Sequence, residues 1–344
     1  PSVPFSGTMD IMTRRLLILL ACGAALVAAQ TKKILVTGLQ PAEVGELKKA
    51  APSGVEVEGV SAAELRARAA EADAILGTIN NDLLRAAPKL KWVQSYSAGV
   101  ERYVTPELKA SGVTLTNGKI IQGPNIADHA FAMLLGLTRE LHRIIPNRSK
   151  EEWMRGQFQP IELRGKTAVI IGVGGIGMQI AQRAKGFDMR VVGVDPKDIS
   201  YTPLVDKLVP PDRLDAVLPE ADVVFISAPH TPQSEGMMGA RQFDLLKKGV
   251  YFIAVSRGKL YDTDALVRSL DSRRLAGAGL DVTNPEPLPK GHALWKFENV
   301  IITPHVAGQS DLVQGRRMDL LKENIRRFAA GEPLLNVVDK TKGY

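Results

Sequence analysis

Three residues in the second half of the chain are of types that can bind an anion and move a proton. Arg257 stands in Val-Ser-Arg-Gly, Glu286 in Asn-Pro-Glu-Pro, and His305 in Thr-Pro-His. A guanidinium is a planar fork of donors that matches a carboxylate, and an imidazole oriented by a carboxylate can give and take a proton near neutral pH. Taken singly, Arg257 could equally be a surface ion pair, Glu286 a solvated loop residue and His305 a strand-end cap. Their order predicts an anion clamp followed by an acid–base pair.

A glycine-rich turn upstream of these residues is typical of a dinucleotide site. It lies between an apolar segment at 167–172, where we expect a strand, and a segment at 178–185, where we expect a helix. One glycine allows the tight turn, one lets the backbone approach a pyrophosphate, and one lets the helix and strand pack closely. The free N–H groups at the helix N-terminus then face the phosphates. The residues of this turn are Gly172, Gly174, Gly175, Ile176 and Gly177.

An acidic residue after the next predicted strand indicates which dinucleotide is bound. Asp195 follows an apolar run at 190–194. A carboxylate at this place accepts hydrogen bonds from the adenosine ribose hydroxyls and repels a 2′-phosphate. The sequence therefore predicts NAD rather than NADP as the cofactor. A glycine turn in an α/β core that binds no ligand is the alternative.

Several motifs in this order resemble those of the D-isomer-specific 2-hydroxyacid dehydrogenase family, which includes phosphoglycerate, glyoxylate and D-lactate dehydrogenases. In chain order they are the glycine turn, 255–258, 277–282 with Glu286, 303–308 and the tail 331–338. The resemblance runs from about residue 32 to residue 344. It implies an NAD-dependent oxidoreductase that interconverts a small 2-oxo acid and its D-2-hydroxy acid by hydride transfer.

The resemblance also implies a role for each residue that would touch or position the substrate. Arg257 and the backbone N–H groups of Ala98 and Gly99 would bind the substrate carboxylate. His305 would donate a proton to the keto oxygen in reduction and accept it in oxidation. Glu286 would orient the His305 ring.

The implied cofactor site extends beyond the glycine turn and Asp195. Asp281 would hydrogen-bond the nicotinamide carboxamide. The other residues expected to line the cofactor are Pro229, Val255, Ser256, Arg257, His305 and Gly308. No metal site is expected.

Short apolar runs alternate with amphipathic segments, which predicts α/β domains with parallel sheets. We expect strands at 33–37, 55–60, 74–77, 92–95 and 113–116, and then at 167–172, 190–194, 223–228, 250–255, 277–281 and 300–303. The resemblance implies two Rossmann-like doubly wound parallel-sheet domains. The NAD-binding domain at 123–304 would be inserted in a discontinuous substrate domain formed by 30–122 and 305–344. The active site would lie in the cleft between them.

Two long helices are also predicted. The segment 125–143 is apolar almost all round, so we expect a helix buried in a core or in a subunit interface. The segment 311–330 is expected to be a helix that ends at Gly331. The apolar helix and the family resemblance together predict a homodimer.

Composition and charge exclude several classes of protein. The 344 residues are 45% hydrophobic and 24% charged, which is typical of a globular protein. The net charge is +7, but Lys and Arg are scattered rather than gathered in a block, so we expect no nucleic-acid partner. A mildly basic enzyme that attracts anionic ligands fits better. Cys22 is the only cysteine, which excludes disulfides and cysteine-based metal sites from the body of the protein.

Residues 1–29 are predicted to be an extension with an export signal. An apolar run at 16–29 follows Arg14 and Arg15, and small residues at 27–29 offer a cleavage site. The run is short for a membrane span, and the paired arginines resemble a twin-arginine signal. We therefore expect export to the periplasm, with membrane contact only through this signal. An uncleaved or lipid anchor and a cytoplasmic protein with an inert extension are the alternatives.

Two other functions fit the same pattern of residues. One is an NAD-sensing regulatory protein on the same fold, because some regulators keep the catalytic residues. The other is an exported binding protein for organic acids. Turnover of any 2-oxo acid would separate the enzyme from both.

The sequence does not specify the substrate, but it offers candidates for its pocket. Arg102 is a candidate for reading a second acidic group on the substrate. Four aromatic residues could line an apolar wall or could equally lie in a core or interface: Trp92, Tyr96, Tyr103 and Trp295.

Overall fold

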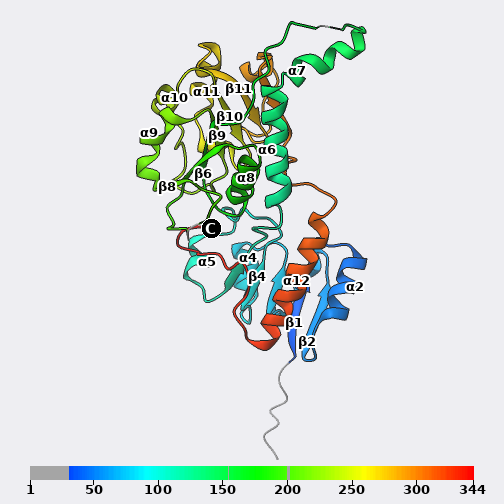
Figure 1. Cartoon of the computed structure of the whole chain (residues 1–344). Helices are drawn as coiled ribbons and strands as arrows, with labels where there is room; N and C mark the ends of the chain where they lie inside the picture. Colours follow the sequence, from blue (N-terminus) through cyan, green and yellow to red (C-terminus); the bar gives the residue numbers. More distant parts are fainter. Residues whose placement is uncertain (1–30, 154, 200–201) are drawn as a thin grey trace, which may run out of the picture.

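Two parallel β-sheets, each covered by helices, form the two lobes of the molecule (Figure 1). The computed structural model describes residues 31–153, 155–199 and 202–344. The strand order is β2-β1-β3-β4-β5 in the first sheet and β12-β11-β10-β9-β6-β7-β8 in the second. Every strand pairing in both sheets is parallel. The predicted fold class, two doubly wound α/β domains, is therefore confirmed.

In the first sheet, successive residues of a strand point into two different apolar cores, one on each face of the sheet. This alternation is typical of strands that are buried on both faces. Leu35 and Ile75 lie in one core, with α3 to α5, whereas Ile34 and Leu76 lie in the other, with α2. The strands are β1 (Lys32–Val36), β2 (Val55–Gly59), β3 (Ala74–Leu76), β4 (Trp92–Gln94) and β5 (Thr114–Thr116). The helices are α2 (Pro41–Ala50), α3 (Ala62–Arg68), α4 (Asn81–Ala86) and α5 (Pro106–Ala110).

The last long helix, α12 (Val313–Ala330), packs on the first sheet although the whole second sheet precedes it in sequence. Its residues Met318 and Leu321 lie in the same core as Ile34 of β1. Figure 1 shows α12 running beside α2. The helix ends at Gly331, which has the left-handed φ of 71° that glycine favours. The chain thus returns to the first lobe after building the second.

The second sheet positions the dinucleotide motif. The helices α6 (Gly123–Thr138) and α8 (Gly175–Gly186) cover one face, and α9 (Leu214–Val217), α10 (Ala240–Leu245) and α11 (Thr263–Asp271) cover the other. The strands are β6 (Thr167–Ile171), β7 (Arg190–Val194), β8 (Lys207–Val209), β9 (Val223–Ile226), β10 (Val250–Ala254), β11 (Leu275–Leu280) and β12 (Val300–Ile302). The strand order reverses between β6 and β9, and doubly wound sheets bind ligands at such a switch point.

The helix predicted for 125–143 is shorter than expected. It ends at Thr138, and Glu140 has a φ of 55°, which breaks the helix before α7 (Leu141–Ile144). The Glu140 carboxylate stabilises this turn by accepting a hydrogen bond from the backbone N–H of Gln159 at 2.7 Å.

One strand, β8, escapes sequence prediction. It has three residues, and none of them is fully buried. Such a short edge strand has no hydrophobic alternation from which it can be detected.

The export signal predicted for residues 1–29 lies outside the described residues, as does Cys22. Within the part of the chain that the structure describes, no helix has the length and apolar character needed to cross a membrane.

Candidate active site

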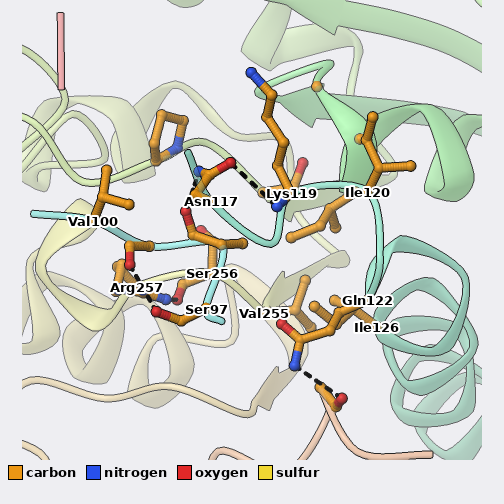
Figure 2. Close-up of a pocket in the computed structure, with 18 of the residues that line it drawn as sticks. Ser97, Val100, Asn117, Lys119, Ile120, Gln122, Ile126, Val255, Ser256 and Arg257 are labelled. Atoms are coloured by element: carbon orange, nitrogen blue, oxygen red, sulfur yellow. Dashed lines mark hydrogen bonds between the residues drawn. The ribbon is translucent and has the colours of Figure 1, made fainter. Parts of the chain in front are cut away.

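A cavity of about 790 Å³ lies between the two domains. Its wall combines Gly99 of the first domain, Gly174 and Val255 of the second, and Arg317 of the returning helix α12. Figure 2 shows Ser97, Val100 and Arg257 grouped on one side of the cavity and Gln122 and Ile126 on another. The predicted chemistry therefore converges on the interdomain cleft.

The structure brings His305 and Glu286 together as a hydrogen-bonded pair. Nδ1 of His305 lies 2.6 Å from Oε1 of Glu286. Because a carboxylate accepts, Nδ1 is the donor, and Nε2 is the ring atom left for another partner. His305 lines the cavity, and its side chain is 44% exposed, so a small molecule in the cleft can reach it.

The loop that carries His305 is held in place by Asp281. His305 has a left-handed φ of 55°, and its N–H donates to the Asp281 carbonyl at 2.9 Å. The Asp281 carboxylate is 2% exposed and accepts hydrogen bonds from Thr303 Oγ1 at 2.6 Å, Val306 N at 2.9 Å and Ala307 N at 3.0 Å. A carboxylate offers about four acceptor positions. One therefore stays available at the cavity wall, where a carboxamide could donate.

Arg257 is held by a carboxylate that the sequence analysis did not identify. Its Nε lies 2.6 Å from Oε1 of Glu101, and its Nη1 donates to the Ser256 carbonyl at 2.7 Å. Burial raises the pKa of Glu101, but the hydrogen bond and charge of Arg257 outweigh it, so that pKa is lowered. The Arg257 Nη2 would lie 1.8 Å from a Cβ at Gly99. Only glycine at this position lets the guanidinium approach the loop so closely.

The loop at Ala98 and Gly99 presents unused donors beside Arg257. Asn117 Nδ2 donates to the Ala98 carbonyl at 2.7 Å, and Ser97 Oγ donates to the Gly99 carbonyl at 3.0 Å. The N–H groups of Ala98 and Gly99 donate to no other described residue. Both residues line the cavity. Adjacent backbone donors next to a guanidinium form a suitable place for a carboxylate.

Packing explains why Gly172 and Gly177 of the dinucleotide turn are glycines, but it does not explain Gly174. A Cβ at Gly172, where φ is 90°, would lie 2.4 Å from Ala228 N, and one at Gly177 would lie 2.0 Å from the Gly172 carbonyl oxygen. A Cβ at Gly174 would meet no protein atom within 4 Å. Gly174, Gly175 and Ile176 line the cavity at the start of α8. The turn thus leaves a cradle that fits a pyrophosphate at a helix N-terminus.

Asp195 lies behind this turn and is not among the residues that line the cavity. Its carboxylate accepts hydrogen bonds from Val173 N and Lys197 N, both at 2.9 Å. It therefore fixes the glycine turn and still has acceptor positions for a ribose hydroxyl. Lys197 does line the cavity, and its Nζ lies 4.6 Å from the centre of the Tyr344 ring.

The remaining residues predicted for the cofactor lie around the same cavity. Pro229, Val255, Ser256 and Gly308 all line it. The Ser256 hydroxyl is buried and has no hydrogen-bond partner among the described residues, so it is available to bond a ligand in the cavity. The Gly308 carbonyl accepts a hydrogen bond from Gln122 Nε2 at 3.1 Å, which ties the His305 loop to the start of α6.

The residues suggested for the substrate pocket lie elsewhere. Arg102 donates to its neighbour Tyr103 at 2.5 Å and is not part of the cavity wall. Trp92 and Tyr103 are buried in the first domain, and Trp295 is on the surface. Tyr96 lies behind Gly38 at the edge of the cavity.

Sequence analysis missed five charged residues of the cavity wall: Glu43, Glu101, Lys119, Lys197 and Arg317. Glu101 is 156 positions from its partner Arg257. No local pattern signals a contact over that distance. Arg317 lies in a helix whose polar residues are mostly on the surface, so its type alone does not distinguish it.

Comparisons with known proteins agree with this arrangement. The model of the D-isomer specific 2-hydroxyacid dehydrogenase NAD-binding domain matches residues 131–307. A glyoxylate reductase of Korarchaeum cryptofilum is 33% identical over 268 residues, which cover 76% of this chain and 80% of that protein. A D-3-phosphoglycerate dehydrogenase of Archaeoglobus fulgidus is 30% identical over 296 residues. These residues cover 83% of this chain but only 56% of that relative. The structure of a D-isomer specific 2-hydroxyacid dehydrogenase from Xanthobacter autotrophicus, in complex with NADPH and MES, superposes with a TM-score of 0.78 at 26% identity. That superposition covers 92% of this chain and all of the other.

A dinucleotide domain joined to a second parallel-sheet domain, with an acid–base pair in the cleft, defines a class of nicotinamide-dependent oxidoreductases. The matches are more specific. The chain belongs to the D-isomer-specific 2-hydroxyacid dehydrogenase family. The resemblance in the sequence motifs is thereby confirmed.

Proposed function

We propose that this protein interconverts a small 2-oxo acid and its D-2-hydroxy acid with NAD(H) as hydride carrier. The observation that carries the proposal is the convergence of the His305–Glu286 pair and Arg257 on one cavity with the dinucleotide turn. The activities named for the relatives, glyoxylate reductase and D-3-phosphoglycerate dehydrogenase, support a small 2-oxo acid as substrate.

Arg257, the Ala98–Gly99 loop and the His305–Glu286 pair each have a part in the proposed reaction. Arg257 and the N–H groups of Ala98 and Gly99 bind the substrate carboxylate and so fix the keto group. Bound NADH supplies the hydride. In reduction, His305 Nε2 gives a proton to the keto oxygen, and in oxidation it takes the proton back from the hydroxyl. Glu286 keeps the ring oriented and balances its charge.

The proposal is tested by following NADH absorbance with the purified protein and a series of 2-oxo acids. Glyoxylate, pyruvate and hydroxypyruvate are the first members, followed by longer chains. Turnover of any of them to the D-hydroxy acid supports the proposal. NADH binding without turnover would support an NAD-sensing regulator instead, and failure to bind NADH would contradict both.

We propose NAD rather than NADP because of the charge of Asp195, although Lys197 lies close by and the Xanthobacter autotrophicus structure holds NADPH. Asp195→Asn removes the charge and keeps an acceptor for Val173. We expect this variant to raise the ratio of kcat/KM for NADPH to that for NADH by about tenfold or more, because a like-charge contact is relieved. Lys197→Gln is the matched control and should lower the same ratio. An unchanged ratio in Asp195→Asn would contradict the role.

The charge of Glu286 should set the pH range of reduction. In that direction His305 must carry its proton, and the Glu286 carboxylate at 2.6 Å stabilises the protonated ring. We expect Glu286→Gln to move the high-pH fall of reductive kcat/KM to lower pH, because the protonated ring loses its anionic partner. Initial rates across pH measure this. A variant with a lower rate but the wild-type pH profile would show that Glu286 only orients the ring.

We propose the domain division 30–122, 123–304 and 305–344. The packing of α12 on the first sheet supports it, because the C-terminal segment then belongs to the same domain as β1. NADH binding should slow hydrogen exchange mainly within 123–304. Equal protection throughout the chain would argue against this division.

We also propose a homodimer. The segment after α6 extends from the body in Figure 1 and exposes apolar side chains, with Ile145 64% and Trp153 94% exposed. An isolated domain does not usually leave such groups in water. Light scattering should give twice the chain mass, and Trp153→Glu with Ile145→Glu should give monomers. A monomeric wild type would refute the proposal.

Export remains the proposal for residues 1–29, supported by the apolar run after Arg14 and Arg15. Cell fractionation should find the protein in the periplasm. Replacing both arginines with lysine should retain it in the cytoplasm, and an unchanged distribution would exclude the twin-arginine route.

A further inference from the structure

A second guanidinium, that of Arg317, reaches the cavity from α12. Its Nε is buried and has no hydrogen-bond partner among the described residues. No carboxylate of the described chain lies within ion-pair distance of it. Arg317 as a whole is half-buried and lines the cavity, so the rest of its guanidinium can meet an anion that arrives from outside.

The surroundings of Arg317 fix its position without neutralising it. Its Cζ lies 5.8 Å from the centre of the Tyr96 ring. The single proton of the Tyr96 hydroxyl is shared between the carbonyls of Thr37 and Leu76, both at 3.0 Å, which anchors the ring. Arg317 therefore rests on a rigid aromatic face rather than moving freely in solvent.

Glu43, another carboxylate of the cavity wall, bonds to other groups and forms no ion pair with Arg317 among the described residues. Its Oε2 accepts a hydrogen bond from Gln40 N at 2.6 Å, and its Oε1 accepts one from Gln314 Nε2 at 3.0 Å. Glu43 thus caps α2 and is not the partner of Arg317. Arg257, the other guanidinium in the cavity wall, already has Glu101 beside it. Arg317 is the guanidinium of the cavity that no described carboxylate balances.

We infer that the substrate is a 2-oxo acid with a second acidic group, and that Arg317 binds this second group. The inference rests on the proposed function, because it places the 2-oxo acid carboxylate at Arg257 and the distal anion at Arg317. The two cations then act on opposite ends of one molecule, and Arg317 determines specificity without taking part in proton transfer.

The test compares two 2-oxo acids of equal length, 2-oxoglutarate and 2-oxovalerate, which differ in the distal carboxylate. We expect the wild type to prefer 2-oxoglutarate. Arg317→Gln should lower kcat/KM for 2-oxoglutarate by about tenfold to a hundredfold, since a hydrogen bond to a charged group is lost. The loss for 2-oxovalerate should be far smaller. Arg316→Gln is the matched control, because it removes the same charge from the same turn and Arg316 does not line the cavity.

A second readout separates this inference from the proposed function. Calorimetry with NADH present should show D-2-hydroxyglutarate binding more tightly than D-2-hydroxyvalerate, and Arg317→Gln should remove the difference. Turnover without preference for the second carboxylate, or equal losses on both substrates, would overturn the inference and leave the proposed function intact. Absence of all turnover would count against the proposed function, and the calorimetry would still decide whether Arg317 selects a second anion.

Discussion

Replacing His305 with asparagine is expected to lower kcat for reduction of a 2-oxo acid by about a hundredfold to ten-thousandfold, the usual contribution of a general acid. The amide cannot give up a proton, so the developing alkoxide must take one from water. Asparagine is the appropriate replacement because residue 305 has a φ of 55°, and asparagine adopts left-handed backbone more readily than most residues. The backbone bonds to Asp281 should then survive. Steady-state rates and single-turnover oxidation of NADH measure the effect.

The control for this variant is a histidine outside the cavity. His142 lies in α7, and its Nδ1 is 3.0 Å from the Gly136 carbonyl oxygen. His142→Asn should leave kcat within about threefold of the wild type, because this half-buried residue does not line the cavity. In His305→Asn the affinity for NADH, measured by fluorescence, should stay close to that of the wild type. A kcat that falls by less than tenfold in His305→Asn would mean that another group supplies the proton.

Much of the fold could be predicted because its determinants are local. Each buried strand is a short apolar run, and the turn at Gly172–Gly177 joins a strand period to a helix period within a few residues. Glycine is required at positions 172 and 177 because a Cβ there would collide with neighbouring backbone atoms, and this close approach follows from the tight turn itself. The same reasoning fails at Glu140, where a non-glycine residue with a φ of 55° ends a helix whose apolar pattern continues.

The candidate site could be predicted in its residue types but not in its pairings. Thr303-Pro304-His305 predicts a functional loop, but no local pattern indicates that the Asp281 carboxylate supports this loop through three hydrogen bonds. The residues proposed to bind the substrate illustrate this difference between residue type and pairing. Arg102 was a candidate for reading a second acidic group, but its side chain turns to Tyr103. Arg317 reaches the cavity only because α12 returns to the first domain. Such contacts arise from tertiary packing, which periodicity does not encode.

Replacing Arg257 with alanine is expected to lower kcat/KM for the 2-oxo acid by about a hundredfold to several thousandfold, since one partner of a charged pair is removed at the binding site. Two effects add. The substrate carboxylate loses its donor fork, and Glu101 is left as an anion beside the Ala98–Gly99 loop. Arg257 is also what lowers the pKa of Glu101 against its burial. Arg257→Lys should recover part of the loss, because it restores the charge without the fork. Unimpaired kcat/KM in Arg257→Ala would refute the assignment.

The double variant Arg257→Ala with Glu101→Gln separates these two effects. If Glu101 repels the substrate once Arg257 is gone, removing its charge should lower KM about tenfold relative to Arg257→Ala alone. A change of this size corresponds to the coupling usually found between residues in contact. Asp82→Asn is a suitable control, because it removes an acidic charge from the exposed surface of the same domain. Were the double variant no better than Arg257→Ala, Glu101 would serve only to hold the guanidinium in place. An improved KM would show instead that the Glu101 charge repels a carboxylate bound beside the Ala98–Gly99 loop.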